Sequence, residues 1–153
     1  DARLKKLEPR TVSIDGKEAV VDRTEEASFN AALNQFKAGE YKSATRAFET
    51  FVAQYPQSSL QASAQFWLGN SQYAAKDAKS ALTTLQNMMQ KYPQHARAAD
   101  AYLTMGHCYE DLNDKKRSAE LYSFVISAFP GSPQAQIAQD ALPKKPAPKV
   151  LKK

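Results

Sequence analysis

Apolar and small residues recur along this chain with a fixed period of 37 residues. The units end at Pro56, Pro93 and Pro130, and the residue before each proline is aromatic. Within a unit, apolar residues are spaced three or four apart, a short polar break follows, and the same spacing resumes up to the proline. This pattern predicts two amphipathic helices joined by a short turn, because proline disfavours helical geometry in the residue before it. A fixed period of this kind is typical of stacked repeat proteins.

The second unit shows the predicted pair of helices most clearly. A first helix is expected over 59–75, with Ser58 or Ser59 as its cap, and a second helix is expected from Asp77 to just before Pro93. Small residues stand where the two helices of each unit would cross. We expect them to let the backbones approach closely, and they are Ala44, Ala81 and Ser118 on the second helices and Gly69 and Gly106 on the first.

The repeats predict one all-α domain over residues 25–142. Its three units cover about 25–56, 59–93 and 96–130, and a single capping helix follows over 132–142. Ser132 can cap this last helix, and Pro133 suits the first helical position. The outward residues of such a cap are polar, which keeps the end of a stack in solution.

The two ends of the chain do not fit the repeat. Residues 1–24 contain Leu4 and Leu7, which suit the last turns of a coiled coil, and then two short extended runs around an Asp15-Gly16 turn. A lone hairpin is marginal in water, so we expect it to be mobile or to pair with another chain. Residues 143–153 carry five lysines and no acid, and are expected to form a disordered tail.

The repeat pattern resembles the tetratricopeptide repeat (TPR) family. The third unit has Tyr102, Met105, Gly106 and Tyr109 at the family's first-helix positions, and the second-helix pattern is present in all three units. The resemblance implies a right-handed superhelix of three TPR-type helix pairs plus the capping helix. The family repeat has about 34 residues, and we expect the three extra residues here to lengthen the first helices of units two and three by about a turn.

In the TPR family the first helices line a concave groove that binds other polypeptides. Matching this register gives a set of partner-binding positions: Phe29, Leu33, Phe36, Phe66, Asn70, Tyr73, Leu103, His107, Glu110 and Asp111. An equal alternative is that the aromatic members fill the core. As a groove, the surface is aromatic at one end and acidic at the other, which suits a peptide or amphipathic helix with apolar anchors and a basic stretch.

Charge and composition exclude several other functions. The net charge of +5 belongs mostly to the tail, because residues 25–142 contain ten bases and eleven acids. The repeats therefore lack the basic stripe that nucleic-acid binding requires. No apolar run approaches the roughly 18–20 residues of a membrane span. The single cysteine, Cys108, excludes an internal disulfide and is expected to be buried.

The sequence gives no sign of an enzyme or a cofactor site. His95 and His107 stand apart, no metal-ligand spacing or glycine-rich phosphate loop is present, and the five glycines are isolated. We therefore expect no catalytic residues, no cofactor and no metal.

A narrower resemblance is to the C-terminal domain of the YbgF/CpoB family, the Tol-Pal-associated periplasmic cell division coordinators. The phrases that carry it are Tyr55-Pro56-Gln57-Ser58, Phe66-Trp67-Leu68-Gly69, Lys91-Tyr92-Pro93, Phe129-Pro130-Gly131-Ser132 and Ala138-Gln139-Asp140-Ala141-Leu142. The segment 4–10 is similar to the end of that family's N-terminal coiled coil.

The YbgF/CpoB resemblance implies a periplasmic adaptor and not an enzyme. It implies a cleaved signal peptide ahead of Asp1, homo-oligomerisation through the coiled coil and binding to TolA. It also implies a link between outer-membrane constriction and peptidoglycan synthesis at division, with a peptidoglycan synthase as a further partner. The Tyr-Pro-x-Ser phrase also occurs in TPR lipoproteins that insert outer-membrane proteins. A structural subunit of such an assembly complex is therefore the alternative.

Overall fold

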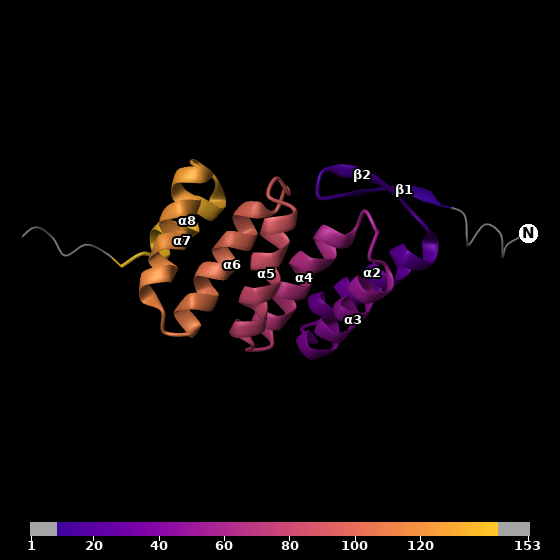
Figure 1. Ribbon diagram of the computed structural model, residues 1–153, viewed down its shortest axis with the longest axis horizontal. Coiled ribbons are helices and arrows are strands. Elements are labelled where there is room, and N and C mark those ends of the chain that lie inside the picture. Colours follow the sequence, from indigo (N-terminus) through magenta and orange to yellow (C-terminus); the bar gives the residue numbers. More distant parts are fainter. Residues whose placement is uncertain (1–8, 144–153) are drawn as a thin grey trace, which may run out of the picture.

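A computed structural model describes residues 9–143 of the chain and shows a row of helices preceded by a hairpin (Figure 1). The described elements are β1 (Arg10–Ile14), β2 (Lys17–Val21), α2 (Arg23–Lys37), α3 (Tyr41–Gln54), α4 (Gln61–Ala74), α5 (Ala78–Lys91), α6 (Ala98–Asp111), α7 (Lys115–Ala128) and α8 (Pro133–Ala141). Each helix packs on the next in sequence order. The seven helices thus form three antiparallel pairs and a final single helix, as the repeats predict. The expected coiled-coil end at 4–10, apart from its last two residues, and the basic tail after Pro143 lie outside the described residues.

Side-chain caps fix where several helices begin. The Asp22 carboxylate accepts the backbone N–H of Glu25 at 2.7 Å, so α2 begins at Arg23, two residues before the expected start of the repeats. Asp77 and Asp114 cap α5 and α7 in the same way. Their carboxylates also sit favourably at the positive end of the helix dipole.

The start of α4 differs from the expectation at 59. Ser58 accepts the backbone N–H of Leu60 at 2.9 Å, which holds residues 58–60 in a turn, and the helix begins only at Gln61. At the other end of the domain, Ser132 accepts the N–H of Ala135 at 3.0 Å, and Pro133 occupies the first turn of α8 as predicted.

The three extra residues of each unit do not lengthen the first helices, so this prediction is wrong. Helices α4 and α6 have 14 residues each, the same length as their partners α5 and α7. The additional residues lie in the connections 55–60 and 92–97 between pairs, whereas the turns within pairs, such as 75–77, are half as long. Tyr55 and Tyr92 end the preceding helices in non-helical geometry just before proline, and the chain then needs a further turn to start the next helix.

Each helical glycine leaves room for one large side chain of the partner helix. A Cβ added at Gly69 would lie 2.6 Å from Leu85, and one added at Gly106 would lie 2.5 Å from the ring of Tyr122. The crossing hypothesis places Ala81 and Ser118 opposite these glycines, but the atoms nearest to the glycines belong to Leu85 and Tyr122. Ala81 is fully buried in a cluster with Cys108 of the next pair. Small residues therefore serve two different contacts, one within a pair and one between pairs.

The N-terminal hairpin packs against the chain's own first helices. Strands β1 and β2 pair antiparallel up to Ile14 and Lys17. Asp15 and Gly16 both have positive φ, 52° and 77°, which is the two-residue turn that suits strand twist. Val21 is buried in the first core cluster, and Val12 and Ile14 pack on it. The described hairpin thus packs on its own chain, while its mobility and its pairing with another chain stay predictions.

Candidate functional site

The residues expected to line the groove separate into three groups by exposure. Phe29, Phe66 and Leu103 are buried, so the core alternative holds for the two phenylalanines, and Leu103 joins them in the core. Leu33, Phe36, Asn70, Tyr73 and His107 are half-buried, and Glu110 and Asp111 are exposed. Only the second and third groups offer side-chain surface to a partner.

The aromatic residues of α2 are held mainly by other rings. Phe29 meets Phe48 and Phe51 of α3 edge-on, with ring centroids 5.9 and 5.7 Å apart. Phe36 stands edge-on to Trp67 of α4 at 5.1 Å, which ties the first helices of two successive pairs together. These ring contacts pack α2 against both α3 and α4.

Side chains of α4 and α6 meet along one continuous face. Asn70 accepts a hydrogen bond from Thr104 at 3.0 Å while its own amide donates to the Phe66 carbonyl. One turn further along, Tyr73 stacks on His107 with ring centroids 6.2 Å apart. We call this surface, made by Asn70, Tyr73, Thr104 and His107, the α4–α6 face. It offers polar groups and ring surface from two neighbouring first helices.

The far end of the α4–α6 face is acidic. Burial raises the pKa of Tyr73, and the nearby Asp111, Cys108 and Glu110 raise it further. Burial and a hydrogen bond to Glu110 likewise raise the pKa of Tyr122. Both phenols therefore stay protonated at neutral pH, and the fixed charge here is that of the two exposed carboxylates.

A hydrogen bond links the third helix pair beneath this face. The Tyr122 hydroxyl and Nδ1 of His107 lie 2.7 Å apart, so the imidazole that stacks on Tyr73 has a fixed orientation. Burial raises the pKa of the adjacent Cys108 thiol to about 12, which leaves it a buried apolar residue and a poor nucleophile.

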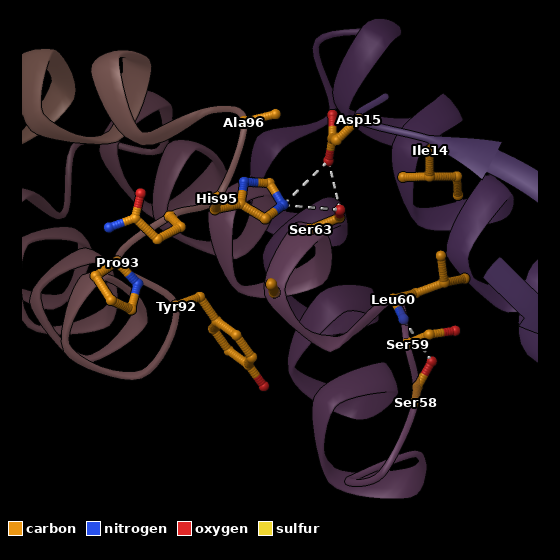
Figure 2. Close-up of a pocket in the computed structure, with 12 residues that line it drawn as sticks. Ile14, Asp15, Ser58, Ser59, Leu60, Ser63, Tyr92, Pro93, His95 and Ala96 are labelled. Carbon is orange, nitrogen blue, oxygen red and sulfur yellow. Dashed lines mark hydrogen bonds and ion pairs between the residues drawn. The ribbon is translucent and has the colours of Figure 1, made fainter. Parts of the chain in front are cut away.

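A second cluster of polar side chains lies where the hairpin tip meets the 92–97 connection (Figure 2). Asp15 accepts hydrogen bonds from Ser63 and from Nε of Arg97, and Nε2 of His95 lies 3.5 Å from the same carboxylate. A cavity of about 300 Å³ borders this cluster, with Leu60, Tyr92 and Pro93 among its walls.

Serine, histidine and aspartate in contact raise the question of a hydrolytic triad, and the geometry argues against one. A triad needs the two imidazole nitrogens to serve different partners, one the serine and one the carboxylate. Here Nε2 of His95 faces both Ser63, at 3.4 Å, and Asp15. Nδ1 accepts the backbone N–H of Arg97 at 3.1 Å instead. The serine hydroxyl donates to the carboxylate, so no base is placed to activate it.

Sequence reasoning missed this second cluster. His95 lies in the connection before α6, which begins at Ala98, and the repeat pattern assigns it no role. Asp15 and Arg97 are 82 positions apart in sequence, and no periodicity joins them because the hairpin is not a repeat. The one signal in the sequence is a change of residue type between repeats. The positions 37 residues after Ser63 and Arg97 hold Asp100 and Gln134.

Within the described residues 9–143, no three or more His, Cys, Asp or Glu side chains gather in a way that could hold a metal ion. No helix there has both the length and the apolar character needed to cross a membrane.

A protein-family model matches most of the chain. The model of the YfiO family, described as outer membrane lipoprotein, matches residues 21–143. No curated protein matches the chain.

Solved structures that resemble this chain include TPR domains. PcrH in complex with the chaperone binding region of PopB has a TM-score of 0.66 and 16% identity, over 78% of this chain and 95% of that one. The second TPR domain of human RPAP3 in complex with the HSP70 peptide SGPTIEEVD has a TM-score of 0.65 and 15% identity, over 80% and 98%. The TPR domain of Arabidopsis FLU has a TM-score of 0.60 and 14% identity, over 68% and 92%. At such low identity these likenesses establish the fold, an all-α stack of TPR-type helix pairs.

Proposed function

The chain belongs to the YfiO family of outer membrane lipoproteins, and we propose that it is a non-enzymatic adaptor of the bacterial envelope that binds a segment of another protein. The observation that carries the proposal is the α4–α6 face. Tyr73 and His107 offer stacked, half-buried rings there, and Asn70 and Thr104 offer a polar pair beside them. Two of the similar folds were solved with a bound polypeptide, PcrH with part of PopB and RPAP3 with an HSP70 peptide.

The partner segment is expected to carry an apolar anchor and a basic stretch. An apolar or aromatic side chain would contact Tyr73 and the half-buried edges of Leu33 and Phe36. Lysine or arginine residues of the segment would lie near Glu110 and Asp111, both exposed at the last turn of α6. Exposed charge of this kind contributes more to the association rate and to specificity than to affinity.

The narrower form of the proposal places the protein in the periplasm, bound to TolA or a TolA-like protein. There it would coordinate Tol-Pal constriction of the outer membrane with peptidoglycan synthesis at division, with a peptidoglycan synthase as a second partner. The resemblance of residues 25–142 to the YbgF/CpoB family supports this form. Homo-oligomerisation would run through a coiled coil that ends near residue 10.

The alternative is a structural subunit of an outer-membrane protein assembly complex. The YfiO family match across residues 21–143 and the Tyr55-Pro56-Gln57-Ser58 phrase favour it. A lipid-modified cysteine at the mature N-terminus of the full-length protein would support the assembly subunit. A cleaved signal followed by heptads would support the Tol-Pal adaptor.

A binding assay with matched variants tests the adaptor function. We expect Tyr73→Ala to weaken binding to a purified periplasmic TolA fragment by roughly tenfold or more, since buried aromatic contacts dominate interfaces. Glu110→Gln together with Asp111→Asn is expected to reduce mainly the association rate at low salt. Phe124→Ala serves as the control, because Phe124 is an exposed aromatic residue on α7, outside this face.

The assay also separates the two candidate functions. Circular dichroism must show an unchanged fold for each variant. Unaltered TolA affinity in Tyr73→Ala would contradict the α4–α6 face as the binding surface. Absence of TolA binding by the unmodified chain, with recovery of an outer-membrane assembly complex from crosslinked envelopes, would favour the alternative.

A further inference from the structure

The carboxylate of Asp15 is enclosed by side chains of the second and third helix pairs. Its side chain is only 6% exposed, although it lies at the tip of a two-residue hairpin turn. Ser63 comes from the first turn of α4 and His95 from the connection before α6, and both point toward Asp15 in Figure 2. Arg97 comes from the same connection as His95. We call these three side chains the cradle.

The cradle presents only hydrogen-bond donors to the carboxylate. Arg97 donates from Nε, and Ser63 donates from its hydroxyl. Because Nδ1 of His95 accepts the backbone N–H of Arg97, the ring proton of the neutral imidazole lies on Nε2, which faces Asp15. The first turn of α4 adds the positive end of a helix dipole. None of these groups is specific to Asp15, and together they suit any carboxylate.

The repeat register shows that this carboxylate replaces one that the second unit lacks. In the third unit, Asp100 occupies the position 37 residues after Ser63, and it accepts a hydrogen bond from Gln134 at 2.9 Å. Gln134 in turn stands 37 residues after Arg97. The third unit thus supplies its own acid at this contact. The second unit has a serine in the acid's place and an arginine opposite, and the hairpin supplies the acid from outside the repeat.

Arg97 is held in position by more than Asp15. Its guanidinium lies over the rings of Phe66 and Trp67, 5.3 and 5.1 Å from their centroids. Stacking of this kind restricts a flexible side chain. The cradle therefore keeps its shape when the carboxylate leaves, which reduces the cost of binding another one.

The hairpin is a displaceable occupant. It has two strands, and among its side chains that the structure describes, Val21 and the half-buried Val12 and Ile14 anchor it on the first core cluster. A two-stranded hairpin has little stability of its own. The cavity of about 300 Å³ beside the cradle stays open with the hairpin tip in place, and it has apolar walls at Leu60 and Tyr92. It leaves room for the residues that flank an incoming carboxylate.

We propose that Ser63, His95 and Arg97 form a carboxylate-binding site that the hairpin tip occupies in cis and that accepts an aspartate or glutamate of a partner's extended segment when the tip withdraws. This site takes the opposite charge from the acidic end of the α4–α6 face. It is therefore a second docking point, and it does not depend on the adaptor function assigned to that face.

The test uses the full 153-residue chain and a peptide copy of the hairpin tip. The probe is the acetylated, amidated peptide Thr-Val-Ser-Ile-Asp-Gly-Lys, which has a single acid, and its control has asparagine in place of aspartate. Asp15→Asn keeps the size of the side chain and removes the charge that holds the tip. We expect this variant to bind the aspartate peptide at least tenfold more tightly than the unmodified chain does, and at least tenfold more tightly than it binds the asparagine peptide.

Two further variants identify where the peptide binds. Adding Arg97→Gln to Asp15→Asn is expected to abolish the gain in affinity, and the Arg97 Nε resonance of the single variant should shift on titration. Asp100→Asn removes the negative charge of the equivalent contact in the third unit without opening the cradle, so it should bind no better than the unmodified chain. If Asp15→Asn unfolds the hairpin, Asp15→Ser is used in its place. Equal affinity for both peptides, or no gain over the unmodified chain, overturns the proposal.

Discussion

Replacing Gly106 by alanine tests the close contact between α6 and α7. A Cβ at this position would lie 2.5, 2.9 and 3.1 Å from three ring atoms of Tyr122, closer than carbon atoms approach without displacement. The ring cannot turn aside easily, because Tyr122 is 1% exposed and its hydroxyl is bonded to His107. The helices must therefore separate or the ring must leave its position.

The size of the effect follows from two opposing contributions. Alanine in place of glycine favours a helix interior by about 1 kcal/mol. Forcing an extra methyl group into a packed core costs roughly 1–3 kcal/mol, and contact with a fixed ring places this case toward the upper end. We expect Gly106→Ala to lower the free energy of unfolding by about 1–2 kcal/mol, which for a chain of this size lowers Tm by roughly 2–8 °C.

Urea unfolding followed by circular dichroism measures the change. The midpoint should fall while the m-value stays the same, since the unfolded chain exposes the same surface. The control places the substitution in a Tyr122→Leu background, where the ring is absent and alanine should be neutral or stabilising. The difference between the two backgrounds gives the coupling energy. If Gly106→Ala alone were as stable as the unmodified chain, the contact geometry between Gly106 and Tyr122 would be refuted.

Substitutions at three other positions probe the fold. Ala81→Leu is expected to destabilise the chain by about 1–3 kcal/mol, because Ala81 is fully buried beside Cys108, and a thermal midpoint that does not move would contradict this packing. Asp22→Ala should cost about 1 kcal/mol through loss of the α2 cap, while Asp22→Asn, which keeps an acceptor oxygen, should be nearly neutral in the same unfolding assay. Burial raises the pKa of Cys108 from 9.0 to about 12, so above pH 9 the unfolded chain binds fewer protons than the folded one. The thiol's contribution to stability is therefore complete below about pH 9 and is lost as the pH rises toward 12, with a loss of about 1 kcal/mol by pH 10. Cys108→Ala should remove that part of the pH dependence, and an identical decline in both proteins between pH 8 and pH 10 would show that the thiol does not titrate as described.

The helix pairs could be predicted from the sequence because their signals are local and occur three times. The proline at each unit's end, the capping Asp77 and the three-and-four spacing all act over a few residues, and the structure follows them closely. The core and groove alternatives for Phe29, Phe66 and Leu103 could not be separated in this way. Residues on one helix stripe share a period whether a neighbouring helix covers them or not, and only the assembled stack determines their exposure.

The cradle could not be predicted because its parts come from elements of different kinds. The hairpin tip meets the second and third units through a contact between residues 82 positions apart, and neither side repeats. The prediction of longer first helices was wrong for a related reason. A count of extra residues does not say whether they extend a helix or a connection, and the turn held by Ser58 decides it at the first connection.

The contact between the hairpin tip and Arg97 also has a consequence for the order of folding. Helices stacked in sequence order form by local steps, and each pair can open or close almost independently of distant pairs. The tip closes a loop of some eighty residues, and that closure carries an entropic cost that only an assembled second unit and 92–97 connection can offset. The hairpin should therefore be the last element to dock during folding and the first to detach during unfolding. The backbone amides of the hairpin should exchange with deuterium faster than those of α4 and α5. In Asp15→Asn the hairpin amides should exchange faster still than in the unmodified chain.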